Sequence, residues 1–268
     1  LSIVGRHVYV SNLNSGVSVV DVSNPGAPYL VASGVSTGGN PYGNIISGRY
    51  MYLANTNQGT LAILDLASTT NPRLLATVLL GSTTQQPLFL ALSGKYLYVN
   101  NSASGTVSVV NVSNPEAPVL VRNIFGGSTG EITAVGPYLY VANSSGQALN
   151  IFDISNPDAP VQVSTTTVPG SISPWGIEVV GRYAFLSASA GAVNTAAVVD
   201  VSSSTAPVVL SNTIPSGSIQ RGMAVNGQHI YIASLNTPNL LSIIRIPGAE
   251  TASLMAHTAD VGSLNARH

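Results

Sequence analysis

The chain of 268 residues carries a formal net charge of −1, contains no cysteine and has only 7% charged residues, against about 25% in an average globular domain. This composition excludes disulfides and cysteine-ligated metals. It also argues against nucleic acid as a partner, because no run of Lys or Arg is available to neutralise phosphates. A stretch of about 18 apolar residues is absent as well, so we expect no membrane span.

The surface should be covered by uncharged polar residues. Hydrophobic residues make up 45% of the sequence, enough for a sizeable core, and Ser, Thr, Asn, Gln and Gly fill most of the remainder. Such a charge-poor surface favours an extracellular or cell-surface location, for which a filament or viral fibre is one setting. The sequence begins in mid-pattern at Leu1 without an initiator Met or a signal peptide, so we interpret it as a mature form or a fragment.

A glycine followed four residues later by an aromatic ring occurs six times, with steps of 42 to 46 residues between successive glycines. The glycines are Gly5, Gly48, Gly94, Gly136, Gly181 and Gly227, and the rings are Tyr9, Tyr52, Tyr98, Tyr140, Phe185 and Tyr231. A period of this length indicates a structural unit built several times.

Each repeat predicts four strands, which we name A to D. Strand A ends just before the glycine, and we expect it at residues 1–4, 44–47, 90–93, 132–135, 177–180 and 223–226. The glycine then makes a tight turn with positive φ. Strand B follows at residues 7–12, 50–55, 96–101, 138–143, 183–188 and 229–234. Both faces of strand B are apolar, which predicts that it is sandwiched between neighbouring sheets.

Strand C is expected at residues 17–22, 61–66, 107–112, 149–154, 196–201 and 241–246, and strand D begins at a proline in the first five repeats. An acid or amide near the end of strand C precedes that proline by seven residues. These positions are Asp21, Asp65, Asn111, Asp153 and Asp200. We interpret them as Asx residues that bond the backbone of their own turn. A ring of carboxylates that binds metal is the less favoured alternative.

Four short antiparallel strands per repeat of this length form one blade of a β-propeller. The predicted fold is therefore all-β, a six-bladed β-propeller of four-stranded antiparallel blades over residues 1–258. We expect the blades at roughly residues 1–38, 39–84, 85–127, 128–170, 171–217 and 218–258. Residues 259–268 would form a tail or begin a stalk or linker.

The segments VVDVSNPGAP, VVNVSNPEAP and IFDISNPDAP each follow a strand with alternating aromatic rings. With these motifs the sequence resembles the LVIVD-repeat β-propellers over roughly residues 1–258. Blades two and five match the turn less well, and blade six matches it poorly. The resemblance implies a propeller that is often secreted or surface-associated, and it implies no catalytic residues.

No motif for catalysis, metal or cofactor binding is found. Neither HExxH, an Asp-rich calcium loop, a phosphate-binding loop nor a G-x-S-x-G elbow occurs. His7 and His229 stand where other repeats have tyrosine, two residues after the glycine, so we interpret them as structural. We therefore predict no catalytic residue, no metal and no cofactor.

To predict a ligand site, we set aside the residues that recur in every repeat and ask which aromatic and charged residues are left. The residues left over lie between strand D of one blade and strand A of the next, at one mouth of the central channel: Tyr42, Phe89, Glu131, Trp175 and Arg221. Exposed aromatics beside a few polar groups are typical of ligand sites. A plug of the channel requires the same residue types and is an equal alternative. Glu131 and Arg221 could also form an ion pair, and Glu178 is a further buried acid.

The preferred function is a non-catalytic binding or structural module that contacts a glycan or another protein and can self-associate. The first alternative is an enzyme that uses Glu131, Arg221 or Glu178 at the channel mouth. The second is an architectural subunit that packs laterally with copies of itself.

Overall fold

The computed structural model of the chain describes residues 1–127, 129–170, 173–188, 195–215, 220–226, 229–234, 240–245 and 255–260. The chain divides into two compact units. Unit 1 comprises Leu1–Thr129 and Asn156–Pro160, and unit 2 comprises Gly130–Ser155 and Val161–His268.

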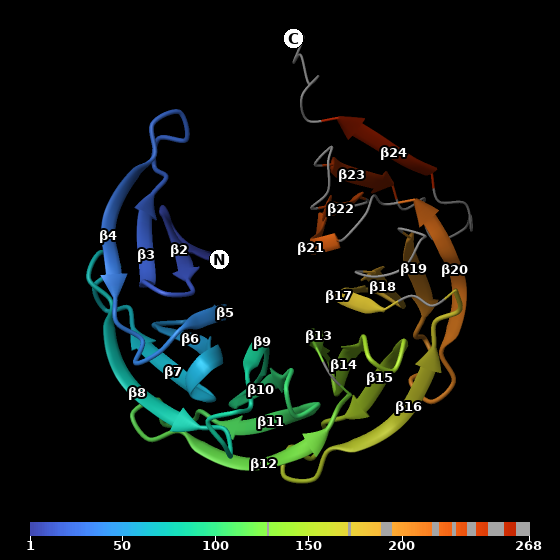
Figure 1. Ribbon diagram of the computed structural model, residues 1–268, viewed down its shortest axis with the longest axis horizontal. Helices are drawn as coiled ribbons and strands as arrows, with labels where there is room; N and C mark the ends of the chain where they lie inside the picture. Colours follow the sequence, from blue (N-terminus) through green and yellow to red (C-terminus); the bar gives the residue numbers. More distant parts are fainter. Residues whose placement is uncertain are drawn as a thin grey trace. The chain divides into compact units, whose positions relative to one another are not determined.

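Unit 1 contains three four-stranded sheets, each built from four consecutive strands in chain order (Figure 1). The first sheet consists of β1 (Ser2–Val4), β2 (His7–Asn12), β3 (Gly16–Asp21) and β4 (Tyr29–Val35). The second consists of β5 (Pro41–Ser47), β6 (Tyr50–Asn55), β7 (Thr60–Asp65) and β8 (Arg73–Leu79), with the short 3-10 turn η1 (Thr56–Gln58) after β6. The third consists of β9 (Pro87–Ser93), β10 (Tyr96–Asn101), β11 (Thr106–Asn111) and β12 (Val119–Phe125).

Unit 2 contains three further sheets of the same design. The fourth sheet consists of β13 (Thr129–Val135), β14 (Tyr138–Asn143), β15 (Ala148–Asp153) and β16 (Val161–Thr167). The fifth consists of β17 (Pro174–Val180), β18 (Tyr183–Ala188), β19 (Thr195–Asp200) and β20 (Val208–Pro215). The sixth consists of β21 (Gln220–Asn226), β22 (His229–Ser234), β23 (Leu240–Arg245) and β24 (Met255–Asp260).

Six antiparallel sheets of four consecutive strands are the blades of a six-bladed β-propeller. The predicted fold class is therefore confirmed. Strand β24 extends two residues past Thr258, where the sequence predicts the end of the propeller. The rest of the predicted tail lies outside the described residues.

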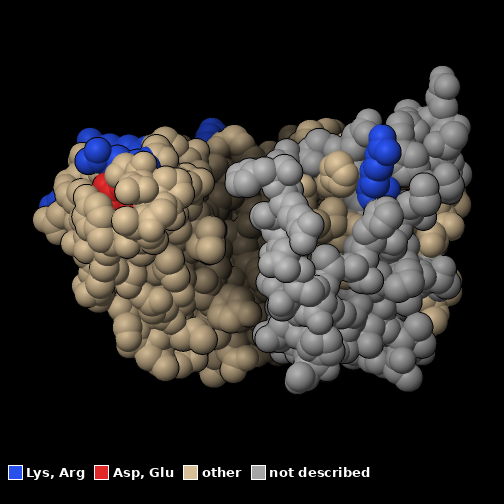
Figure 2. All heavy atoms as spheres, turned by 90° about the horizontal axis from the view of Figure 1, so that it is seen from above, with Lys and Arg blue, Asp and Glu red and all other residues tan. Residues whose placement is uncertain are grey.

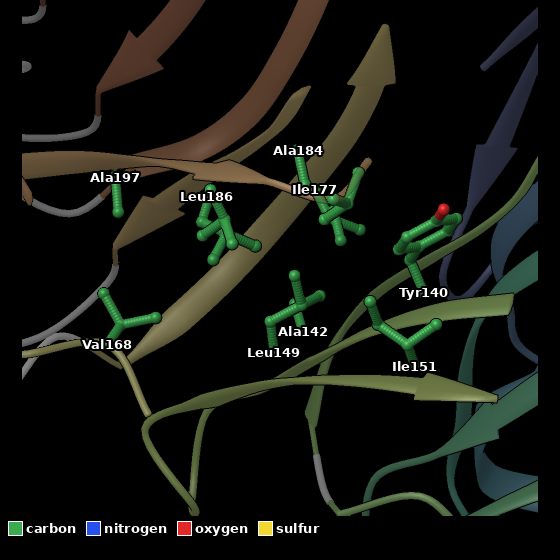
Figure 3. Packing of buried hydrophobic residues seen from close by; sticks show 11 residues of the cluster. Tyr140, Ala142, Leu149, Ile151, Val168, Ile177, Ala184, Leu186 and Ala197 are labelled. Atoms are coloured by element: carbon green, nitrogen blue, oxygen red, sulfur yellow. The ribbon is translucent and has the colours of Figure 1, made fainter. Parts of the chain in front are cut away.

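The second strand of a blade is largely buried, as its two apolar faces predict, and the third strand is buried to a similar extent. In β6, β10 and β14 every residue after the first is buried. Figure 3 shows the resulting core between the fourth and fifth sheets, where Leu149 and Ile151 of one sheet lie near Ile177 and Leu186 of the other. Small residues such as Ala184 in the same cluster let the two sheets approach closely.

The glycine between strands A and B makes the predicted tight turn. In five blades its φ lies between +56° and +58°, a conformation that costs other residues roughly 1–2 kcal/mol. These glycines are Gly5, Gly48, Gly94, Gly136 and Gly181. Gly227, the sixth, lies outside the described residues.

The first strands of blades two to six begin earlier than the sequence predicts. Strand β5, for example, begins at Pro41 and not at Asn44. A β-bulge explains the difference, because Pro41 pairs with Asn55 while the next aligned pair is Asn44 with Leu53. One extra residue of β5 is accommodated in the bulge, and pairing with β6 continues beyond it to Pro41. Tyr42 and its counterparts therefore lie within bulged strands and not in loops.

The core between the fourth and fifth sheets gives a stability prediction. Ile151 is fully buried there, so Ile151→Ala should lower the free energy of unfolding by about 2–5 kcal/mol. The control is Val161→Ala in the same sheet, where the side chain is 59% exposed and the expected change is within about 0.5 kcal/mol. Denaturant unfolding measures both, and equal losses in the two variants would contradict this packing.

Candidate functional site

The repeated acid at the end of strand C bonds its own turn, as predicted. In five blades the side-chain Oδ1 accepts a hydrogen bond from the backbone N–H two residues on, at 2.7–2.9 Å. The acceptors are Asp21, Asp65, Asn111, Asp153 and Asp200. The residue type at this position is explained by turn formation.

Arginine partners of these acids were not predicted. Arg6 lies 3.2 Å from Asp21, and Arg182 lies 3.0 Å from Asp200. Arg49 donates from Nε and Nη2 to the two oxygens of Asp65, which holds the pKa of that carboxyl down at about 2. A signal for these pairs was present in the sequence, because each arginine directly follows the turn glycine of its blade.

The Asp65–Arg49 pair predicts an acid-sensitive contribution to stability. Because the pKa of Asp65 is lower in the fold than in the unfolded chain, its contribution is complete above about pH 4 and is lost as the pH falls towards 2. Asp65→Asn keeps the acceptor for the turn but removes the charge. Its unfolding midpoint should therefore depend less on pH between about 4 and about 2 than that of the wild type.

Asp158→Asn is the control for that experiment, because it removes an exposed turn carboxylate. Parallel pH profiles of the wild type and Asp65→Asn would refute the assignment.

His7 takes the place of the tyrosines, as predicted. It pairs with Asp21 across β2 and β3, in the register in which Tyr50 pairs with Asp65. The His7 ring is buried, and its Nε2 lies 3.6 Å from Asp21 Oδ2. Tyr29, at the start of β4, donates its hydroxyl to that same oxygen at 3.1 Å. His7 and Tyr29 thus both contact the Asx residue of the first blade, Asp21.

In unit 1, two of the predicted site residues come together. The rings of Tyr42 on β5 and Phe89 on β9 meet edge to face, with centroids 5.7 Å apart. Both residues are half-buried. The strands that carry them approach closely at Gly43, where a Cβ atom would lie 2.2 Å from the carbonyl oxygen of Leu88. The aromatic pair is therefore held by a close contact between two neighbouring first strands.

In unit 2, Glu131 of β13 reaches the neighbouring first strand. Its Oε2 accepts a hydrogen bond from the Ile177 backbone N–H of β17 at 3.2 Å. Burial raises the pKa of Glu131 to about 7, the hydrogen bond opposes this shift, and the nearby charge of Glu178 adds to it. Gly176 leaves the space for this contact, because a Cβ atom there would lie 3.2 Å from the same oxygen.

The remaining predicted residues also lie on first strands of unit 2. Trp175 and Glu178 are half-buried on β17, and burial raises the pKa of Glu178. The backbone of Arg221 lies in β21, but its side chain is outside the described part, and so is the predicted Glu131–Arg221 ion pair. A single rosette of all five residues remains a prediction, because Tyr42 and Phe89 belong to unit 1 and the other three to unit 2.

Sequence reasoning missed a cluster of amide side chains in unit 1. Asn40, just before β5, donates its backbone N–H to Gln58 Oε1 at 2.9 Å, and Gln58 Nε2 donates back to Asn40 Oδ1 at 3.1 Å. Asn40 Nδ2 donates in turn to Asn14 Oδ1 at 2.9 Å. No sequence signal marks these residues, since they belong to no motif and lie in three separate loops.

Two further findings bear on the site. Among the described residues, no group of three or more His, Asp or Glu side chains is placed to hold a metal ion. The only helical element in the described ranges is the three-residue turn η1, and no helix there is long and apolar enough to cross a membrane.

The repeat identifies the family of this propeller. The LVIVD repeat matches at residues 1–35, 43–79, 89–124 and 126–168, which together make up more than half of the chain. The chain therefore belongs to the LVIVD-repeat family, as the turn motifs predict. No protein of curated function matches the sequence.

Solved structures with the same fold include proteins named as sugar lactonases. A putative 6-phosphogluconolactonase of Bacteroides uniformis is similar over 96% of this chain and 83% of its own, with a TM-score of 0.79 and 15% identity. The periplasmic gluconolactonase of Pseudomonas aeruginosa is similar over 96% and 82%, with a TM-score of 0.76 and 15% identity. Hydrazine synthase of Kuenenia stuttgartiensis is similar over 82% and 66%, with a TM-score of 0.67 and 19% identity. At these identities the likeness shows the fold alone.

Glu131 gives a prediction for stability at neutral pH. A carboxyl whose pKa is higher in the fold than in the unfolded chain destabilises the fold as it ionises, so its cost develops as the pH rises from about 4 to about 8. Glu131→Gln stays neutral and keeps an acceptor for the Ile177 N–H. The variant should be more stable than the wild type at pH 8, on the order of 1–3 kcal/mol, and equally stable near pH 4.

The exposed Glu116→Gln serves as its control, and the measurement is denaturant unfolding across this pH range. A variant that is less stable than the wild type at pH 8 would show that the ionised carboxylate is the favoured form.

Proposed function

We propose that the chain is a non-catalytic binding module, displayed outside the cell, that contacts a glycan or another protein. The observation that carries the proposal is the aromatic pair of Tyr42 and Phe89, held half-buried at the bulged starts of two neighbouring first strands. A fixed aromatic surface beside polar loops is the usual composition of a recognition site. The location outside the cell rests on the low charge of the sequence.

The side chains at the bulge support this proposal because they differ from blade to blade, although the bulge itself recurs. Five residues before the turn glycine the chain has Phe89 in one blade, Glu131 in another and a glycine in three more, Gly43, Gly176 and Gly222. A position that served only to build blades would favour one residue type throughout. Variation at a bulge, beside glycines that permit close strand approach, is typical of a surface whose side chains are adapted to a ligand.

The test is binding of the purified chain to a glycan array and to candidate protein partners, with Tyr42→Ala and Trp175→Ala as variants. We expect each variant at a true contact to weaken binding by about tenfold or more, since a buried aromatic contact is worth at least about 1.4 kcal/mol. Leu30→Ala, exposed on β4, is the matched control and should bind like the wild type. Full binding by Tyr42→Ala would exclude the Tyr42–Phe89 pair as the site, and full binding by Trp175→Ala would exclude Trp175.

An enzyme is the second candidate, favoured by the pKa of Glu131. A carboxyl that titrates at about 7 can both accept and donate a proton at neutral pH, which general acid–base catalysis requires. Since two similar folds are named as gluconolactonases, sugar lactones are the substrates to try first. If the chain is an enzyme, Glu131→Gln should lower the hydrolysis rate by about 100-fold or more in a pH-stat assay.

A wild-type rate no greater than spontaneous hydrolysis would remove lactones as substrates. The architectural alternative predicts instead that the chain assembles with itself, which sedimentation over a range of concentrations measures directly.

A further inference from the structure

The charged residues of unit 1 are concentrated at one end of its sheets. The opposite end is formed by the connections between second and third strands and between successive sheets. These connections contain no Asp, Glu, Lys or Arg, and they comprise residues 13–15, 36–40, 56–59, 80–86 and 102–105. The other end carries Arg6, Arg49 and Lys95 in its turns, with Asp21 and Asp65 beside them.

Figure 2 shows the same segregation from the side. In the coloured part at the left, the blue and red atoms gather along one edge, and the rest of that face is tan. A ligand that approaches the uncharged end therefore meets hydrogen-bonding groups without a net field. Such an end cannot neutralise a charged ligand, so a neutral one is favoured.

At this uncharged end the amide cluster joins three loops into one rigid surface. Asn14 follows β2, Asn40 precedes β5, and Gln58 ends η1. The two reciprocal bonds between Asn40 and Gln58 fix both side chains, and the bond to Asn14 extends the array across two blades. Gly39 permits the contact, since a Cβ atom there would lie 2.3 Å from Gln58 Oε1.

The cluster has hydrogen-bonding capacity left for a ligand. An amide nitrogen carries two hydrogens, and those of Asn40 and Gln58 each use one in the bonds just described. The Asn14 side chain is exposed and accepts through Oδ1, which leaves its own two donors directed to solvent or ligand. Because these groups are already ordered, a ligand would bind without paying the usual cost of fixing them.

Tyr42 lies close in the chain to the amide cluster. Its Cα is two residues from that of Asn40, which limits their separation to about 7 Å. The edge-to-face contact with Phe89 holds the ring in one place. Amides that donate and accept, beside a fixed ring without charge, complement a sugar, which offers many hydroxyls and an apolar C–H face.

We infer that this surface binds a neutral carbohydrate, with Asn14, Asn40 and Gln58 as the hydrogen-bonding groups and Tyr42 as the apolar platform. The inference rests on the proposed binding function and specifies its ligand class and its place on unit 1.

The experiment compares the wild type with Gln58→Leu and Asn14→Ala on an array of neutral, sialylated and sulfated glycans. We expect binding to neutral glycans that changes less than about twofold between low salt and about 0.5 M NaCl. Each variant should weaken that binding by about tenfold, the effect of losing roughly one good hydrogen bond. Gln162→Leu is the matched control, because Gln162 is an exposed amide on β16, and it should bind like the wild type.

Several results would overturn the inference in distinguishable ways. Binding confined to sialylated or sulfated glycans, or a steep loss with salt, would exclude a neutral ligand but leave the binding module intact. Neutral glycans bound by both variants as tightly as by the wild type would place the site elsewhere. Binding to a protein and to no glycan would exclude the ligand class alone, whereas binding to neither would reject the proposed function as well. Thermal unfolding checks that each variant is folded. Asn14→Ala changes an exposed side chain, so we expect it to fold and to test the inference even if Gln58→Leu does not.

Discussion

Burial of the second strand on both faces is the constraint on which the rest of the structure depends. A strand such as β10, with five consecutive buried residues, cannot be covered by its own sheet. Neighbouring sheets must therefore lie face to face, and clusters such as that of Tyr52, Leu61, Leu97 and Val110 form between them. The hydrophobic stabilisation of each blade thus depends on its neighbour, which is why the repeat recurs along the whole chain.

The turns at one end of each sheet maintain this arrangement. The residue after the Asx position donates its N–H to the carbonyl of the residue after the turn glycine, as Leu66 does to Arg49 at 2.8 Å, and the same bond recurs in five blades. Together with the Asx bond and the arginine pairs, it connects the A–B turn to the C–D turn. In unit 1 most charged side chains lie in or beside these turns, whereas the connections at the opposite end of its sheets contain no Asp, Glu, Lys or Arg.

The fold was predictable because each of its elements has a local cause. The glycine turns, the alternation in strand B and the Asx–proline spacing each depend on residues close together in the sequence, and in the first five blades the glycine and Asx turns were found where expected. The bulge that moves the start of β5 from Asn44 to Pro41 was not predictable, because it depends on the register with β6. The amide cluster of Asn14, Asn40 and Gln58 depends on how three loops meet, which no local pattern records.

The candidate site residues show the same division between local and long-range causes. Subtracting the repeat selected Tyr42 and Phe89, and the structure shows that their rings meet at the same end of adjacent first strands. It could not show that Glu131 lies against the Ile177 N–H, because that contact joins two sheets. The same kind of close approach therefore places an aromatic pair in unit 1 and a carboxyl that titrates near neutrality in unit 2. The bulged first strands fix the backbone, and the side chains at the bulge determine the chemistry of each blade.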